Sequence, residues 1–120
     1  MIVGIGTDIV LKSRINKIKD KLRFAKRILT LDEQEIYNTK GDKQSDYLAK
    51  RFAAKEAIAK AFGTGISSKL GFKDFAILND SHGKPIVVTE HEVLAKYRAH
   101  ISISDEKDHC LAFAIIESTN

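Results

Sequence analysis

The chain has 120 residues, of which 43% are hydrophobic and 30% are charged, a balance typical of a folded globular protein. Its 20 Lys and Arg residues outnumber its 16 Asp and Glu residues and give a net charge of +4. One cysteine excludes a disulfide framework and fits a reducing compartment, and no apolar run approaches the roughly 20 residues that a membrane span needs. We therefore expect a single cytoplasmic domain over residues 1–120, with no membrane as a partner.

The positive charge is concentrated in the first half of the chain. Residues 1–60 carry 14 basic and 8 acidic side chains, whereas residues 61–120 carry 6 and 8. Residues 12–27 alone hold eight basic residues and one acid, Asp20. Such asymmetry indicates something about binding partners rather than about the fold. It is typical either of a solvated helix face or of a surface that attracts an oppositely charged partner.

The first 40 residues predict one strand and two helices. Residues 2–10 are an apolar run broken by glycines, which favours a buried strand that ends near Asp8. Apolar residues spaced by three and four over residues 12–29 predict one amphipathic helix with a basic outer face. Thr30 followed three residues later by Glu33 is a capping box, which predicts a second, short helix.

The next segment predicts a long helix and a hairpin. Residues 45–62 carry the longest helical signal, and Gly63 after them is suited to a left-handed helix end. Residues 72–78 and 85–88 predict two strands joined by a turn of Asn, Asp, Ser and Gly residues.

The last 30 residues predict a helix and two strands. Thr89 with Glu92 matches a capping box, which predicts a helix over residues 90–98. Strands at residues 101–104 and 111–117 follow. The whole order predicts an α+β fold, in which a mostly antiparallel sheet packs with a long central helix and flanking helices.

Asp8, Glu56 and Lys60 are the candidates for chemistry. A carboxylate near a strand end is suited to a hard cation such as Mg²⁺, although this residue alone favours a simple helix cap. Glu56 and Lys60 lie four residues apart and so share one helix face. They are either an exposed ion pair or a metal ligand beside a phosphate contact, and the spacing allows both. The small residues after this helix, from Gly63 to Gly65, are typical of a helix end and would also let backbone approach a phosphate.

Four sequence blocks occur in the order of a known family. They are Gly4-Ile5-Gly6-Thr7-Asp8-Ile9-Val10, Arg51-Phe52-Ala53-Ala54-Lys55-Glu56-Ala57 continuing through Lys60-Ala61-Phe62-Gly63-Thr64-Gly65, Asn79-Asp80 with Gly83-Lys84-Pro85, and His100-Ile101-Ser102-Ile103-Ser104. Together they resemble the holo-[acyl-carrier-protein] synthases, the short type of 4'-phosphopantetheinyl transferase. The resemblance implies a 4'-phosphopantetheinyl transferase-like fold.

The resemblance also implies a reaction. The 4'-phosphopantetheine arm of coenzyme A is transferred to a serine hydroxyl of apo-acyl carrier protein, in fatty acid biosynthesis, and adenosine 3',5'-bisphosphate leaves. Asp8 and Glu56 would hold a Mg²⁺ ion, and Lys60 would stabilise the departing phosphate, so these three would be the catalytic residues. The serine proton would pass either to Glu56 or to a water on the metal.

The same resemblance implies contacts to coenzyme A and one departure from the family. The implied contacts are Lys60, Gly63, Gly65, Lys84 and Pro85. Many members have a histidine directly after the last block, where this chain has Asp105. No catalytic histidine is therefore expected there, and a carboxylate near phosphates needs a metal, a cation or solvent beside it.

The basic segment gains a role from the resemblance, because acyl carrier proteins are acidic and dock on this part of family members. The expected partner-binding residues are Arg14, Lys17, Ile18, Lys21, Phe24 and Arg27, with Ile28 as a further apolar anchor. The resemblance also implies a homotrimer whose sites lie between subunits. Two other functions remain open from the residues: a basic nucleic-acid-binding module and a metal-dependent phosphohydrolase that uses Asp8 and Glu56. We expect no nucleic acid as a partner, because aromatic residues are few.

Overall fold

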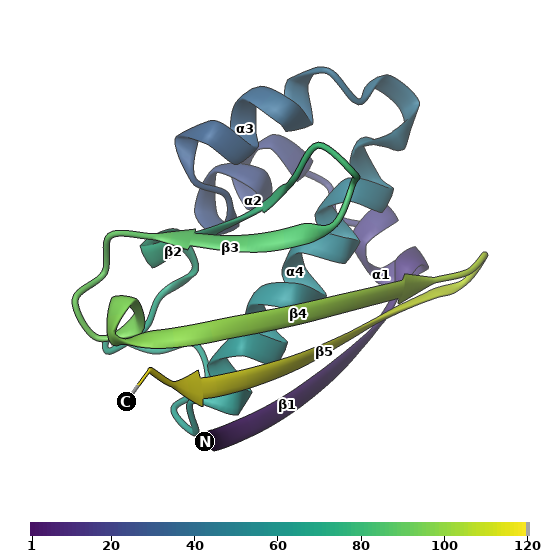
Figure 1. The fold of residues 1–120 in the computed structure, drawn as a ribbon. Coiled ribbons are helices and arrows are strands. Elements are labelled where there is room, and N and C mark those ends of the chain that lie inside the picture. Colours follow the sequence, from purple (N-terminus) through teal and green to yellow (C-terminus); the bar gives the residue numbers. More distant parts are fainter. Residues whose placement is uncertain (120) are drawn as a thin grey trace.

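The computed structural model describes residues 1–119. A long helix lies across one face of a three-stranded antiparallel sheet, and a separate two-stranded hairpin and three shorter helices flank it (Figure 1). The strands of the larger sheet, in spatial order, are β1 (Ile2–Leu11), β5 (His109–Ser118) and β4 (Tyr97–Asp105). The hairpin consists of β2 (Phe75–Asn79) and β3 (Pro85–Thr89). The helices are α1 (Lys12–Asn16), α2 (Lys21–Ile28), α3 (Leu31–Asn38) and α4 (Gln44–Ala61). The predicted α+β class with antiparallel sheets and a long central helix is confirmed.

The contact between α4 and the sheet is built from very small residues. Helix α4 presents buried alanines at 53, 57 and 61, and strand β5 presents buried alanines at 112 and 114. Strand β1 contributes Gly4 and Gly6 to the same contact. A methyl group added at Gly6 would lie 2.6 Å from the backbone nitrogen of Ala61 and closer still to the carbonyl oxygen of Ala57. Backbone therefore packs directly against backbone, which only glycine permits.

The single helix predicted over residues 12–29 is wrong, because two helices occupy this segment. Helix α1 ends at Asn16, and α2 begins at Lys21. Asp20 causes the second start, since its side chain accepts a hydrogen bond from the backbone N–H of Arg23 at 3.0 Å. A carboxylate in the middle of a helical pattern can cap a new helix instead of extending the old one.

The helix predicted over residues 90–98 is also wrong. A single 3-10 turn, Leu94–Lys96, is followed at once by strand β4, which begins at Tyr97 and pairs with β5. The hydroxyl of Thr89 accepts from the N–H of His91 and donates to the carbonyl of Asp74, so it forms no capping box with Glu92. Pairing along the whole length of β5 outweighs the local helix signal.

The other elements differ from the predictions only at their ends. A 3-10 turn, Phe72–Asp74, replaces the first part of the strand predicted at residue 72. Strand β1 continues past Asp8 to Leu11. The capping box of Thr30 and Glu33 is present as predicted. No helix within residues 1–119 is long and apolar enough to cross a membrane. The single cysteine, Cys110, is buried on β5, and burial raises the pKa of its thiol to about 11.

Candidate active site

Asp8 and Lys60 form a direct ion pair between β1 and α4. Asp8 lies within β1, and the alternation of the strand turns its side chain toward the helix. Its Oδ1 atom accepts a hydrogen bond from Lys60 Nζ at 2.9 Å, and the same ammonium donates to the carbonyl oxygen of Thr7 at 3.0 Å. The Asp8 side chain is 15% exposed and that of Lys60 is 51% exposed. The cation is therefore held in place by the strand and remains open to a ligand.

Glu56 is the third member of this cluster. It lies one turn before Lys60 on α4, so both side chains point from the same helix face. Burial raises the pKa of the Glu56 carboxyl, and the negative charge of Asp8 raises it further, while Lys60 acts in the opposite direction. Because Lys60 contacts Asp8 directly and Glu56 lies one turn away on the same helix face, the three side chains border the same part of the contact between β1 and α4. The structure thus brings together all three residues that the sequence singled out.

The glycine pattern explains why this cluster forms. Gly4, Gly6 and Asp8 alternate along β1 and so lie on the same face of the strand. The two glycines let α4 approach the strand closely, and Asp8 follows them at the point where Glu56 and Lys60 pass. In the sequence Gly-x-Gly-x-Asp, the two glycines therefore allow close packing of strand and helix, and the aspartate places a carboxylate beside the helix.

The donor set fits a magnesium ion that is shared with a substrate. Asp8 and Glu56 supply two carboxylates from different elements, and within residues 1–119 no group of three or more His, Cys, Asp or Glu side chains could hold a metal alone. Mg²⁺ is commonly held by one or two carboxylates, with the remaining positions filled by water and substrate phosphates. Two carboxylates beside an exposed cation match that pattern, because they leave the remaining positions of the metal to water and to substrate phosphates.

The segment after α4 turns away through two glycines in the left-handed region. Gly63 has a φ of +80° and Gly65 a φ of +61°. The N–H of Gly63 donates to the carbonyl of Lys60, and that of Gly65 donates to the carbonyl of Ala59. This turn begins three residues after Lys60 and is hydrogen-bonded to its carbonyl, so its backbone borders the same end of the helix.

A second site lies on the other side of α4. A pocket of about 210 Å³ is lined by residues that include Lys40, Lys50, Arg51, Asn79, Pro85 and Asp105. Pro85, a sequence-predicted contact, lines it, but Lys84 is not among its lining residues. Arg51 lies five residues before Glu56, which places the two side chains about 140° apart around the helix axis. A single chain therefore presents this pocket and the Asp8 cluster on different sides of one helix.

Arg51 is a residue that the sequence analysis quoted in a motif but assigned no role. It is only 4% exposed, and its guanidinium lies 4.6 Å from the centre of the Tyr47 ring. One terminal nitrogen donates to Asn79 Oδ1 at 2.7 Å, while the Nε atom is buried without a hydrogen-bond partner. A buried guanidinium with an unused donor, beside two further cations, is suited to an anionic ligand.

The family of the chain follows from comparison with known proteins. Residues 4–114 match the family model of the 4'-phosphopantetheinyl transferase superfamily. The chain belongs to this superfamily. A holo-[acyl-carrier-protein] synthase of Bacillus cereus (strain G9842) is 44% identical over 122 residues, which cover 100% of this chain and 99% of that protein. The family predicted from the four sequence blocks is confirmed.

Solved structures resemble this transferase along nearly its whole length. The holo-(acyl-carrier-protein) synthase of Bacillus anthracis str. Ames, in complex with CoA (3',5'-ADP), superposes with a TM-score of 0.89 at 42% identity and covers 99% of both chains. That of Helicobacter pylori, in complex with coenzyme A, superposes with a TM-score of 0.83 at 30% identity, covering 94% of this chain and 99% of that one. The alternatives of a nucleic-acid-binding module and a phosphohydrolase find no support in these comparisons.

Asp105, which directly follows the last of the four sequence blocks, is paired with a lysine. Lys12 Nζ lies 2.9 Å from Asp105 Oδ2 and 2.6 Å from Asp46 Oδ1, so one cation bridges two acids. The hydrogen bond to Asp46 raises the pKa of Lys12 to about 12, with Asp105 adding to the effect and burial opposing it. The Asp105 carboxylate, which lines the Arg51 pocket, is thus paired with the ammonium of Lys12.

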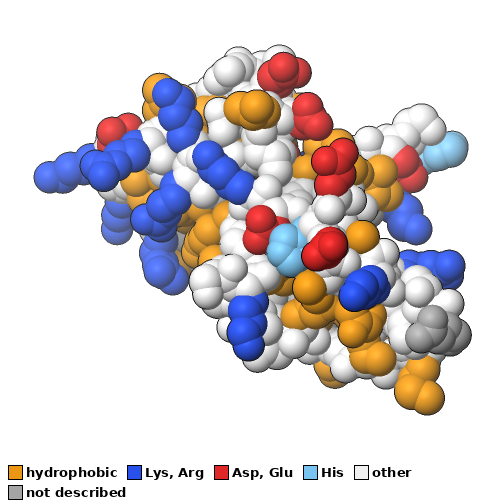
Figure 2. Space-filling model, turned by 90° about the vertical axis from the view of Figure 1, so that its left-hand side faces the viewer, with side chains coloured by type: hydrophobic (Ala, Val, Ile, Leu, Met, Phe, Trp, Pro, Cys, Tyr) orange, Lys and Arg blue, Asp and Glu red, His pale blue; other side chains and the backbone are white. Residues whose placement is uncertain are grey.

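The basic segment of the transferase forms an exposed surface on α1 and α2. Figure 2 shows Lys and Arg side chains crowded on one flank of the molecule, around hydrophobic side chains. Arg14, Lys17 and Arg27 are exposed, whereas Lys21, Ile18 and Phe24 are half-buried. Ile28 is fully buried, so its predicted use as an anchor for a partner is wrong. The Phe24 ring lies 5.7 Å from that of Phe52, which in turn lies 5.7 Å from that of Phe72.

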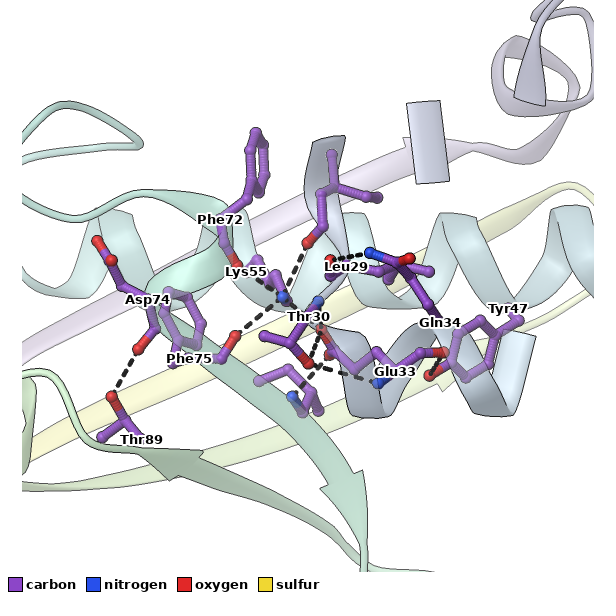
Figure 3. Close-up of polar contacts among 12 residues, drawn as sticks. Leu29, Thr30, Glu33, Gln34, Tyr47, Lys55, Phe72, Asp74, Phe75 and Thr89 are labelled. Carbon is purple, nitrogen blue, oxygen red and sulfur yellow. Dashed lines mark hydrogen bonds and ion pairs between the residues drawn. The ribbon is translucent and has the colours of Figure 1, made fainter. Parts of the chain in front are cut away.

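Lys55 and Glu33 form a buried ion pair that the sequence analysis missed (Figure 3). Both side chains have no solvent exposure, and Lys55 Nζ lies 2.6 Å from Glu33 Oε1. The sequence showed Glu33 as a helix cap and Lys55 as part of a motif. Because the two residues are 22 positions apart, no local pattern could have joined them.

Proposed function

We propose that this transferase moves 4'-phosphopantetheine from coenzyme A to a serine hydroxyl of an apo-acyl carrier protein, with release of adenosine 3',5'-bisphosphate. The observation that carries the proposal is the cluster of Asp8, Glu56 and Lys60 in a chain that shares its whole length with holo-[acyl-carrier-protein] synthases. Phosphoryl transfer needs positioning and charge compensation from the protein rather than covalent chemistry. Two carboxylates and one held cation supply those needs.

Each residue of the cluster has a proposed part in the transfer. The serine oxygen forms a bond to the phosphorus that carries pantetheine, while the bond from that phosphorus to the bridging diphosphate oxygen breaks. Glu56 is the proposed acceptor of the serine proton, because its carboxylate lies one helical turn from Lys60, which contacts Asp8. Lys60 stabilises the negative charge that leaves on adenosine 3',5'-bisphosphate, since its ammonium is exposed and fixed by two acceptors.

Asp8 and Glu56 are the proposed ligands of a magnesium ion. When bound, Mg²⁺ neutralises charge on the diphosphate of coenzyme A. A carboxylate has two oxygens, so Glu56 can serve the cation with one and accept the proton on the other. Asp8 lies within the sheet and orients the pair, because its strand leaves it little freedom.

The Arg51 pocket is the proposed site for a phosphate of the nucleotide end of coenzyme A. Its support is the unused buried donor of Arg51, with Lys40 and Lys50 beside it and Pro85 on its wall. Gly63 and Gly65 are proposed to let backbone approach the diphosphate next to Lys60. Lys84 stays a prediction, because its side chain does not line the pocket.

A homotrimer with sites between subunits would let one coenzyme A reach both parts of the site. Within one chain these parts lie on different sides of α4, whereas a neighbouring subunit could place its Arg51 pocket opposite the Asp8 cluster. Strands β1 and β5 also expose an apolar face suited to burial by another subunit. Its residues are Val3, Ile5, Ile9, Leu111 and Phe113. Ile5 and Ile9 are 62% and 63% exposed, which is unusual for isoleucine on a sheet.

The carrier protein is proposed to dock on the exposed basic residues of α1 and α2 together with Phe24, which we call the carrier-docking surface. The contacts proposed there are Arg14, Lys17, Ile18, Lys21, Phe24 and Arg27. An acidic partner would be steered to this surface, and the half-buried Phe24 beside Phe52 would add apolar contact. A cytoplasmic location stays a proposal, supported by the single reduced thiol of Cys110.

The test is a transfer assay with purified components. The protein is mixed with coenzyme A, Mg²⁺ and an apo-acyl carrier protein, and the carrier is weighed by mass spectrometry. We expect a mass gain equal to one phosphopantetheine, which disappears when EDTA removes the metal. A carrier of unchanged mass under these conditions would refute the proposed activity, and unchanged transfer in EDTA would refute the metal.

A further inference from the structure

The buried ammonium of Lys55 joins four separate segments of the chain. Besides Glu33 Oε1 on α3, it lies within 2.8 Å of the carbonyl oxygen of Ile28, 2.6 Å of that of Phe72 and 2.9 Å of that of Phe75. These carbonyls belong to the last residue of α2, to the 3-10 turn before β2 and to the start of β2. Figure 3 shows the lysine at the centre of these acceptors.

Glu33 completes the network on its other side. Its Oε1 atom also accepts from the backbone N–H and the hydroxyl of Thr30, and its Oε2 atom accepts from the backbone N–H of Ile77 at 2.8 Å. Both buried charges therefore have hydrogen-bond partners from several elements. A network satisfied in this way holds its members in a single arrangement.

The segments that Lys55 joins are those that build the carrier-docking surface. Ile28 ends the helix that carries Phe24 and Arg27. The Phe72 ring stacks on that of Phe52, and the Phe52 ring packs at a tilt against that of Phe24. The ring contacts and the lysine thus tie α2 and the 3-10 turn to the same stretch of α4. On that helix Lys55 directly precedes Glu56.

We infer that the Lys55–Glu33 pair is a positioning unit that fixes the carrier-docking surface onto the helix that bears Glu56. The inference rests on the proposed function, since it needs a carrier protein that binds α2. The pair touches neither substrate, and it acts through the orientation of α2 and the Phe24–Phe52–Phe72 cluster. A role in stability alone would not require charge, because buried ion pairs can often be replaced by apolar residues without loss of stability.

The decisive variant is Lys55→Met, which keeps the length of the side chain and removes its charge and its donors. The matched control is Ile116→Ala, which destabilises the core at a fully buried residue of β5, outside the four segments that Lys55 joins. Both proteins are assayed well below their melting temperatures, and KM is measured separately for the carrier and for coenzyme A. We expect Lys55→Met to raise the carrier KM about tenfold or more, with the coenzyme A KM changed little. Ile116→Ala is expected to lower the melting temperature and to leave both KM values near wild type.

A second variant keeps the test decisive if Lys55→Met does not fold. Thr30→Ala removes both hydrogen bonds of the Thr30 hydroxyl with Glu33, one donated to Oε1 and one accepted from the backbone N–H, and leaves the ion pair in place. We therefore expect a smaller rise in the carrier KM in the same direction. The inference is overturned if the foldable variants of this network lower the melting temperature and leave the carrier KM unchanged, or if both KM values rise equally. Failure of the proposed function is distinct, because the wild-type protein would then transfer nothing.

Discussion

Replacing Gly6 with alanine tests whether backbone contact between β1 and α4 sets the geometry of the site. The added methyl would lie 2.6 Å from Ala61 N and 3.1 Å from Lys60 Cβ, and closer than either to the carbonyl of Ala57. Ordinary contact begins at 3.4 Å, so α4 must move from the strand by roughly 1 Å. The same movement separates Asp8 from Glu56 and Lys60.

Two magnitudes decide the expected outcome. Overpacking a tight contact costs about 1–3 kcal/mol, and the entropy that alanine removes from the unfolded chain returns only about 0.4–1 kcal/mol. Gly6→Ala should therefore fold with reduced stability. A misplacement of about 1 Å at reacting groups can cost about 10²-fold in rate, so we expect kcat/KM for transfer to fall by about that factor.

The matched control is Gly41→Ala, which lies outside the contact between β1 and α4. Gly41 has a φ of +55° and open space around it, so alanine there meets only the left-handed backbone cost of about 1–2 kcal/mol. The two variants should lose similar stability in thermal unfolding, whereas only Gly6→Ala should lose transfer in the mass-spectrometric assay. A Gly6→Ala protein with wild-type kcat/KM would refute the argument that glycine delivers Asp8 to the helix.

Four further predictions concern single side chains. Asp8→Ala and Glu56→Ala should each reduce transfer at least about 10²-fold in the mass assay while the circular dichroism spectrum stays native. Arg14→Glu should raise the KM of the carrier more than that of coenzyme A, because it reverses a charge on the carrier-docking surface. Arg51→Met should raise the KM of coenzyme A and discriminate less between coenzyme A and its 3'-dephospho form. Burial raises the pKa of Asp46, but hydrogen bonds from two lysines outweigh it and lower that pKa. The stability that Asp46 contributes should then be fully present at neutral pH and should be lost as the pH falls through its lowered pKa. The free energies of unfolding of Asp46→Asn and wild type, measured with urea, should therefore differ at neutral pH and become equal in acid.

Each of these predictions has a result that contradicts it. Wild-type turnover in either carboxylate variant would remove the cluster from catalysis. Lys96→Glu, an equal charge reversal at an exposed residue outside α1 and α2, is the control for Arg14, and equal effects of the two would argue against docking on the basic helices. An Arg51→Met protein that still distinguishes the two coenzyme forms fully would place the phosphate elsewhere. A constant stability gap between Asp46→Asn and wild type from neutral pH into acid would contradict the pKa argument.

Only part of the active-site cluster could be predicted from short-range rules. The spacing of four residues placed Glu56 and Lys60 on one helix face, whereas the place of Asp8 beside them followed from the family resemblance, because strand and helix are far apart in the sequence. The capping box at Thr30 and the left-handed Gly63 were also readable, because each depends on a few adjacent residues.

The errors lie where distant parts of the chain decide the local structure. Residues 97 and 98 belong to the helix predicted over residues 90–98, yet they pair with strand β5 as the start of β4. Asp20 begins a new helix by accepting a hydrogen bond from the N–H of Arg23. The sequence did not show this, because a capping aspartate cannot be told from an ordinary surface aspartate within a helical pattern. Arg51 and Lys55 stood in a recognised motif, but their partners, Asn79 and Glu33, lie 28 and 22 residues away. Only the folded chain reveals that Lys60 is exposed and that Lys55 is enclosed.

The burial of Cys110 determines whether the enzyme can form a disulfide with the thiols of its substrate and product. Both coenzyme A and the modified carrier end in a free thiol, and thiols exchange with protein cysteines only through an accessible thiolate. Cys110 is 1% exposed with a pKa of about 11, so at neutral pH it offers neither access nor a thiolate. The enzyme should therefore form no mixed disulfide with its substrate or product in air. The transfer moves one thiol from coenzyme A to the carrier, so a thiol-reactive dye reports product only on carrier that has been separated from coenzyme A. The buried Cys110 of the native enzyme should add no background to that measurement.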